Sequence, residues 1–226
     1  MLLQRPACYP IRPGNSSKAL NPVPLDGGVF MVAGISGHPR APFLPYTVDE
    51  ATGIRQLCED HSISFEQAIN SHAKPSEVMA TIDGSSFSIL HFACHGLGHE
   101  IYEANALVLE DDYNSSGGRL LTTRMIEKLD LRNIQTVILS ACNSSYTHGK
   151  RGTTVQGLCW AFLNAGVKSV FATRFVISDY YGAQIGKSIY EPLIDKMPPI
   201  EVLNYVRETR SSSIPPKHMA SWALFI

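Results

Sequence analysis

The 226-residue chain lacks the features that mark several large classes of protein. None of its apolar runs approaches the roughly 18 residues of a membrane-spanning helix. The first residues, MLLQRPACYPIRPG, are interrupted by Arg5, Pro6 and Pro10, unlike the continuous apolar core of a secretory signal. The formal net charge is −1, without a basic cluster or an acidic tail, so we expect neither nucleic acid nor a membrane surface as a partner.

The five cysteines also lack a recognisable pattern. Their number is odd and no C-x-x-C pair occurs, so neither a zinc site nor a disulfide framework is indicated. Free thiols are typical of a reducing compartment, and we therefore expect an intracellular, cytoplasmic protein.

What the sequence does contain is an alternation of apolar strands and amphipathic helices. Continuous apolar runs predict buried strands at 27–36, 87–94, 135–142, 168–175 and 221–226. Helical periodicity predicts helices at 47–60, 75–82, 121–131, 155–166, 179–193 and 200–210, with a capping signal at Thr47 and a terminating glycine at Gly166. Strands that are apolar throughout are typical of parallel sheets covered on both faces. We predict a proline-rich linker or irregular lead-in over residues 1–27 and one α/β domain over residues 28–226.

Reactive side chains follow two of the predicted strands. His95 and Gly96 follow the strand at 87–94, and Cys142 ends the strand at 135–142, 47 residues beyond His95 (142 − 95). The carboxyl ends of parallel strands form the ligand-binding edge of a sheet, so His95 and Cys142 meet if their strands are neighbours. An imidazole activates a thiol as a nucleophile, and the backbone N–H groups of Gly96 and Cys142 are candidate donors to an oxyanion.

These residues belong to a set of ordered motifs: HFACHG, VILSACNSS, GLCWAFLNAGVKSVFATRFVISD and SWALF. Over residues 28–226 the set resembles the CHAT domain, a branch of the caspase-like cysteine peptidases that includes relatives of separase. The resemblance implies a three-layer α/β/α sandwich around a mostly parallel sheet, with His95 as general base and Cys142 as nucleophile. It also implies a protein or peptide substrate and no metal or other cofactor.

The residues that would select the substrate are less clearly marked. Where the family usually has Leu-Trp, this chain has Arg174 and Phe175. Asp179 is expected by position as the N-cap of the helix that follows it. In separase relatives the matching Asp can meet a basic residue before the scissile bond, and both roles could coexist. Arg174 could instead bind an acidic residue, and the sequence leaves both possibilities open. We predict that Asp179, Arg174, Phe175 and Ser140 contact the substrate.

The other histidines and cysteines near His95 have plainer interpretations. His91 lies in the same strand, on the face of His95, and we interpret it as a structural residue hydrogen-bonded beneath the site. Cys94 points to the opposite face and is expected in the core. A metal site formed with His99 is less favoured, because the spacing of converging ligands is missing.

Two functions remain open from the sequence. The first is a cysteine endopeptidase, forming the C-terminal effector part of a larger protein and working with a helical-repeat regulatory region or partner. The alternative is a catalytically silent caspase-like interaction or regulatory module.

Overall fold

The computed structural model describes residues 8–9, 21–34, 43–97, 105–112, 118–143 and 153–226, without the side chains of 8–9, 142–143 and 153–156. The strands are β1 Cys8–Tyr9, β2 Val29–Ala33, β3 Phe65–Ile69, β4 Ile89–Leu97, β5 Ala106–Val108, β6 Leu120–Thr122, β7 Thr136–Asn143, β8 Ser169–Thr173 and β9 Trp222–Phe225. The helices are α1 Tyr46–Asp60, α2 Pro75–Ile82, α3 Thr123–Ile126, α4 Thr153–Asn164, α5 Asp179–Ser188, α6 Tyr190–Ile194, α7 Pro199–Arg210 and α8 Pro216–Met219, with a 3-10 turn at Asn70–His72.

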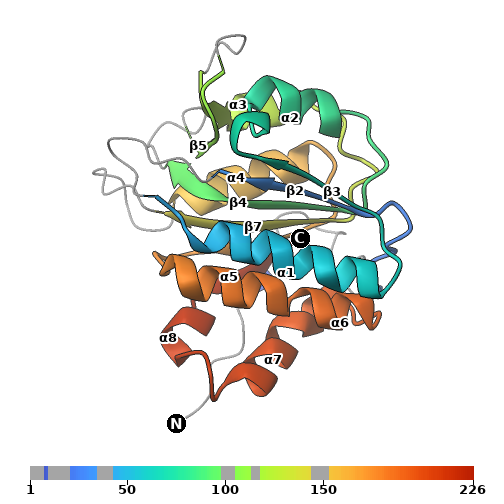
Figure 1. The fold of residues 1–226 in the computed structure, drawn as a ribbon, viewed down its shortest axis with the longest axis vertical. Helices are drawn as coiled ribbons and strands as arrows, with labels where there is room; N and C mark the ends of the chain where they lie inside the picture. The colour runs from blue at the N-terminus through green and yellow to red at the C-terminus, as the bar shows by residue number, and fades with distance from the viewer. Residues whose placement is uncertain (1–7, 10–20, 35–42, 98–104, 113–117, 144–152) are drawn as a thin grey trace.

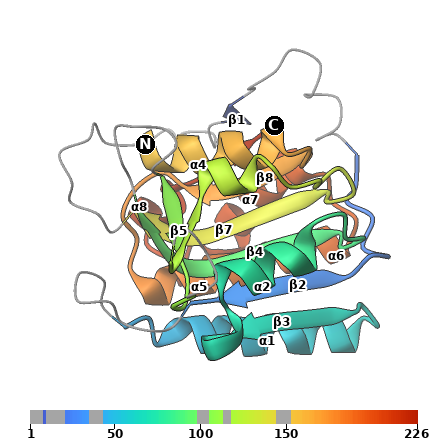
Figure 2. The same ribbon diagram turned by 90° about the horizontal axis from the view of Figure 1, so that it is seen from above.

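The strands form one sheet in the order β1-β9-β8-β7-β4-β2-β3. Every pair along this path is parallel except β8 with β9, and the short strands β5 and β6 add an antiparallel extension to β4. Figure 2 shows β7, β4, β2 and β3 side by side in this order. The prediction of a mostly parallel sheet is therefore confirmed.

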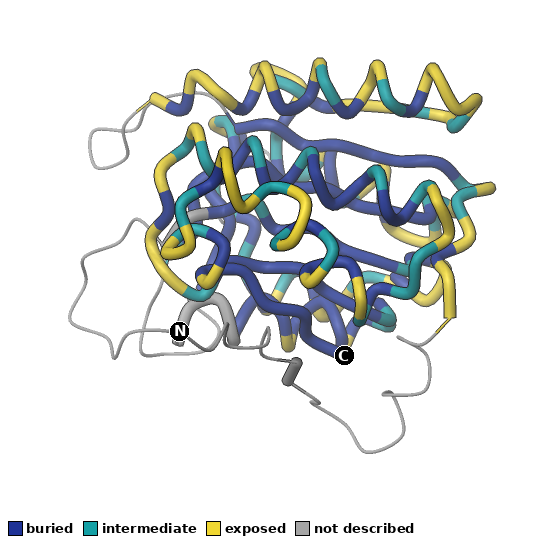
Figure 3. Tube along the Cα trace, turned by 90° about the horizontal axis from the view of Figure 1, so that it is seen from below, coloured by how far each residue is buried: buried dark blue, intermediate teal, exposed yellow. Residues whose placement is uncertain are grey.

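Helices cover both faces of the sheet. Figure 1 shows α1, α5, α6 and α7 on one face and α2, α3 and α4 on the other. Alternate side chains of β2, β4, β7, β8 and β9 join separate apolar cores on the two faces. In Figure 3 the central strands β2, β4, β7 and β8 are buried, whereas the helices expose one side to solvent. This is the predicted three-layer α/β/α sandwich.

Several predicted boundaries differ from the structure. Strand β3 was not predicted, since its sequence FEQAI is half polar and lies at the edge of the sheet. The predicted helix at 121–131 is instead strand β6 followed by the single turn of α3. The predicted helix at 179–193 divides into α5 and α6 at Ile189.

The two capping predictions had different outcomes. Thr47 does not cap α1: the helix begins at Tyr46, and the Thr47 hydroxyl donates a hydrogen bond to the carbonyl oxygen of Leu44. Gly166 does end α4, because it has a φ of 114° and its N–H donates to the carbonyl oxygen of Leu163. Within the described ranges, no helix has the length and apolar character needed to cross a membrane.

Candidate active site

The site is built where β4 and β7 run side by side. These two parallel strands are direct neighbours, and their register pairs His95 with Cys142 and Gly96 with Asn143. Neighbouring strands lie about 4.8 Å apart. The expected meeting of the His95 and Cys142 positions is therefore present in the backbone, while the thiol itself lies outside the described side chains.

The end of β4 is held on both sides. Strand β2 pairs with β4 as far as Ala93, and β5 then takes its place, pairing Val108 with His95 and Leu107 with Gly96. The strand consequently extends through Leu97, so His95 and Gly96 lie within it and not after it. His95 is only 3 % exposed, which fits an imidazole held in a fixed orientation.

Cys94 faces away from this site. It joins the core on the α2 and α4 side of the sheet, while Ala93 joins the core on the other side. Burial raises the pKa of the Cys94 thiol to about 12. A thiol that remains protonated at neutral pH is a poor nucleophile, so the expectation that Cys94 is a core residue is confirmed.

Asp179 is the first residue of α5, and the charge of His95 acts on its carboxylate. The cap of α5 is the Ser178 hydroxyl, which accepts a hydrogen bond from the N–H of Tyr181. The Asp179 carboxylate instead accepts one from the N–H of Tyr46, the first residue of α1, at 2.9 Å. The interpretation of Asp179 as the cap of its own helix is thus wrong, because it caps a helix 133 residues away in sequence.

The charges around Asp179 and Arg174 differ. Burial raises the pKa of Asp179, the Tyr46 hydrogen bond opposes this, and the charges of Glu50 and His95 act on it in opposite directions. The charge of Arg174, by contrast, reinforces burial in lowering the pKa of Arg207.

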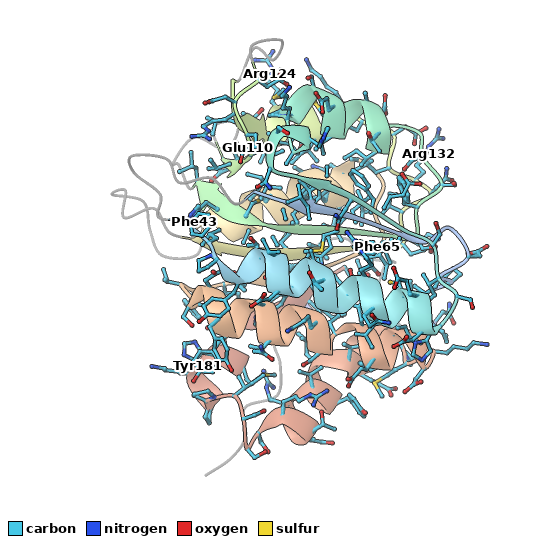
Figure 4. The ribbon with its side chains drawn as sticks, viewed as in Figure 1. Phe43, Phe65, Glu110, Arg124, Arg132 and Tyr181 are labelled. Carbon is cyan, nitrogen blue, oxygen red and sulfur yellow. The ribbon has the colours of Figure 1, made fainter. Side chains whose placement is uncertain are left out.

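Arg174 and Phe175 lie against each other. The Arg174 guanidinium lies over the Phe175 ring, 5.0 Å from its centroid. Phe175 is 46 % exposed and Val176 is 65 % exposed, so this segment presents an apolar surface to solvent. Figure 4 shows two further aromatic residues, Phe43 and Tyr181, at one end of the molecule and Arg132 at the other.

On the α1 side of the sheet lies a chain of polar side chains, buried except for half-buried Ser140, which we call the Glu50 network: Glu50, His91, Ser140 and Tyr190. Glu50 Oε2 accepts a hydrogen bond from the Ser140 hydroxyl at 3.1 Å, and Glu50 Oε1 lies 3.0 Å from His91 Nε2. His91 Nδ1 lies 3.1 Å from the Tyr190 hydroxyl. Burial raises the pKa of Tyr190, so the phenol keeps its proton and can donate a hydrogen bond to His91 Nδ1.

The Glu50 network explains two predicted residues and adds two that were missed, Glu50 and Tyr190. His91 is fully buried and hydrogen-bonded, as expected of a structural residue. Ser140 is half-buried and donates to Glu50, and its contact with substrate stays a prediction. Glu50 was missed, although its spacing from Ile54 and Cys58 places a carboxylate on the apolar face of α1.

Among the described side chains, no three or more His, Cys, Asp or Glu residues are grouped as metal ligands. His99, considered for such a site, lies outside the described residues.

The CHAT domain family matches the chain over residues 11–226, which is almost its whole length. The chain belongs to the CHAT domain family. This confirms the resemblance carried by the sequence motifs. No curated protein sequence matches this CHAT domain.

Solved structures place the CHAT domain in the caspase-like cysteine peptidase fold. Gingipain R, the Arg-specific cysteine proteinase of Porphyromonas gingivalis, is 14 % identical with a TM-score of 0.56, over 93 % of this chain and 47 % of the gingipain chain. Separase of Saccharomyces cerevisiae, in its complex with securin, is 12 % identical with a TM-score of 0.59, over 90 % and 12 % of the two chains. The Drosophila initiator caspase Dronc is 11 % identical with a TM-score of 0.50, over 95 % and 86 %. At such identities the likeness concerns the fold.

Proposed function

We propose that this CHAT domain is a cysteine endopeptidase with His95 as general base and Cys142 as nucleophile. The observation that supports this most is the register of β4 and β7, which pairs these two residues at the carboxyl edge of the sheet. The buried position of His95 and the inert character of Cys94 are consistent with this assignment.

In the proposed reaction, His95 takes the thiol proton of Cys142 and the sulfur attacks the carbonyl carbon of the scissile peptide bond. The backbone N–H groups of Gly96 and Cys142 donate hydrogen bonds to the resulting oxyanion. The tetrahedral intermediate collapses as the C–N bond breaks, and His95 gives the proton to the leaving amine. Water, deprotonated by His95, then cleaves the thioester and releases the new carboxylate.

We further propose that Asp179 binds a basic side chain before the scissile bond. Its carboxylate lies near His95 together with the negative charge of Glu50. Arg174 lies over the exposed ring of Phe175, which favours a role for Arg174 and Phe175 at the edge of the substrate-binding surface. The Arg specificity of gingipain, a protein of the same fold, is compatible with this assignment.

The direct test uses a fluorogenic peptide library varied at the residue before the scissile bond. Cys142→Ala and His95→Ala should each abolish cleavage, whereas Cys94→Ala, a matched change of a buried thiol on the opposite face, should retain it. Cleavage that persists in Cys142→Ala would contradict the mechanism. If the chain cleaves no peptide and a peptide electrophile does not label Cys142, the interaction-module function is favoured instead.

Two variants test the substrate preference. Asp179→Asn keeps an acceptor for the Tyr46 N–H but loses the charge, so KM for basic peptides should rise about tenfold or more. Arg174→Gln should leave the basic preference intact. An acidic preference that disappears in Arg174→Gln would reverse the assignment.

A further inference from the structure

The Glu50 network connects α1 to the two strands that carry His95 and Cys142. Glu50 contacts β4 at His91, four residues before His95, and β7 at Ser140, two residues before Cys142. Because side chains alternate along a strand, these contact positions lie on the same face of the sheet as positions 95 and 142. One carboxylate on α1 thus holds both strands just beneath the site.

The polar contacts of the network are compatible with one another in one arrangement of protons. The Tyr190 hydroxyl donates to His91 Nδ1, which leaves the ring proton on Nε2, facing Glu50 Oε1. The ring N–H does not point straight at this oxygen, so the 3.0 Å approach is mainly an electrostatic contact. The Ser140 hydroxyl donates to Glu50 Oε2, and both carboxylate oxygens are therefore held in place.

The position of the Glu50 carboxylate is also restricted by packing. Glu50 and His91 are 1 % and 0 % exposed, and α5 covers them with a glycine. A Cβ atom on Gly186 would lie 1.9 Å from Glu50 Oε1 and 3.4 Å from His91 Cε1. The helix can approach this closely only because residue 186 has no side chain.

We propose that Glu50 is a positioning residue for the His95–Cys142 pair. It fixes β4 and β7 relative to each other and to α1, and so sets the spacing at which the imidazole and the thiol meet. This inference rests on the proposed peptidase function, because it requires a reactive pair to be positioned. The fixed positions of its two carboxyl oxygens, one beside His91 and one bonded to Ser140, provide this effect.

Three variants on α1 separate positioning from stability. Glu50→Leu removes both acceptors, and we expect kcat to fall on the order of 100-fold with KM within about twofold, the scale expected for a reacting group misplaced by about 1 Å. Glu50→Gln should retain kcat within about threefold, because its amide oxygen can take the place beside His91 Nε2 and its NH₂ can donate to Ser140. Ile54→Ala, one turn further along the same buried face, should lower the melting temperature and leave kcat unchanged.

A second measurement does not depend on finding a substrate. The rate at which iodoacetamide alkylates Cys142, followed by peptide mass spectrometry at pH 7, reports the thiolate fraction that His95 maintains. This rate should fall about tenfold in Glu50→Leu and in Ser140→Ala, and stay near the wild-type value in Glu50→Gln and Ile54→Ala.

The outcomes distinguish the two proposals. If wild-type Cys142 reacts no faster than Cys142 in His95→Ala, no activated pair exists, and the peptidase function and the positioning role both fail. If the wild-type thiol is activated and Glu50→Leu matches Ile54→Ala in kcat and alkylation, only the positioning role is overturned. A Glu50→Gln variant as inactive as Glu50→Leu would likewise overturn it, since the contacts of a neutral side chain with His91 and Ser140 would then not be sufficient.

Discussion

Two glycines of α5 provide a matched test of how tightly the Glu50 network is enclosed. A Cβ atom on Gly186 would meet Glu50 Oε1 at 1.9 Å, whereas one on Gly182, a turn earlier, would meet nothing closer than the Ser140 hydroxyl at 3.6 Å. The second distance is an ordinary van der Waals contact. Alanine should therefore fit at position 182 and clash at position 186.

The expected magnitudes follow from these distances. Replacing glycine by alanine inside a helix gains about 1 kcal/mol, so Gly182→Ala should raise the melting temperature by about 2–4 °C in a domain of this size. In Gly186→Ala the carboxylate must retreat by about 1.5 Å to reach ordinary contact, which breaks its approach to His91 at 3.0 Å. An unsatisfied buried charged group costs about 3 kcal/mol or more, so the net loss is about 2 kcal/mol and the melting temperature falls by about 4–8 °C.

The assay is urea unfolding followed by circular dichroism, with thermal unfolding as a second probe. The clash is identified by repeating Gly186→Ala in a Glu50→Ala background, where the oxygen is gone and the substitution should become neutral or stabilising. A Gly186→Ala variant as stable as Gly182→Ala would refute the reasoning. So would an equal destabilisation by Gly186→Ala in both backgrounds.

Three further predictions concern thiol reactivity, pH and the polar network. Cys94 should resist iodoacetamide in the native state at pH 8 and react in urea, because burial holds its pKa at about 12; rapid native labelling, mapped by mass spectrometry, would contradict its position. The pKa of Asp179 is raised above its usual value of about 3.9. As pH falls through this pKa, protonation removes the charge that binds basic peptides, so their KM should rise. Asp179→Asn should show no such change. Replacing all four polar members of the Glu50 network by apolar residues of similar size should leave the free energy of unfolding within about 1 kcal/mol of wild type or raise it, while alkylation of the reactive cysteine slows; a loss of several kcal/mol would show that the network stabilises the fold.

Much of the fold could be predicted because local sequence determines it. β4 and β7 are continuous apolar runs that suit only a sheet covered on both faces. His95 and Cys142 come at the ends of such runs, so the reactive edge of the sheet was recognisable before any pairing was known. The register that aligns them depends on two strands separated by a crossover, and a sequence pattern can suggest this pairing but cannot measure it.

Interactions between distant segments could not be predicted in the same way. Asp179 accepts the N–H of Tyr46 across 133 residues, and the usual local rule, that an acid before a helix caps that helix, gave the wrong partner. Ser178, the preceding residue, was an equally good cap by type and is the one that serves. The local rule predicted a side chain that caps a helix here, and tertiary packing determined which residues form the cap.

Glu50 shows where a departure from a pattern carries information. A carboxylate on the buried face of α1 costs free energy unless its partners hold it, and an apolar residue would usually serve stability at least as well. The structure meets this cost with partners on β4 and β7 and with a glycine on α5 that leaves room for the oxygen. Each of these accommodations lies beneath the paired positions 95 and 142, where accurate spacing matters for proton transfer. The presence of Glu50 on the apolar face of α1 was therefore a sequence feature that indicated the site. Its meaning could be recognised only after its contacts with β4 and β7 were known.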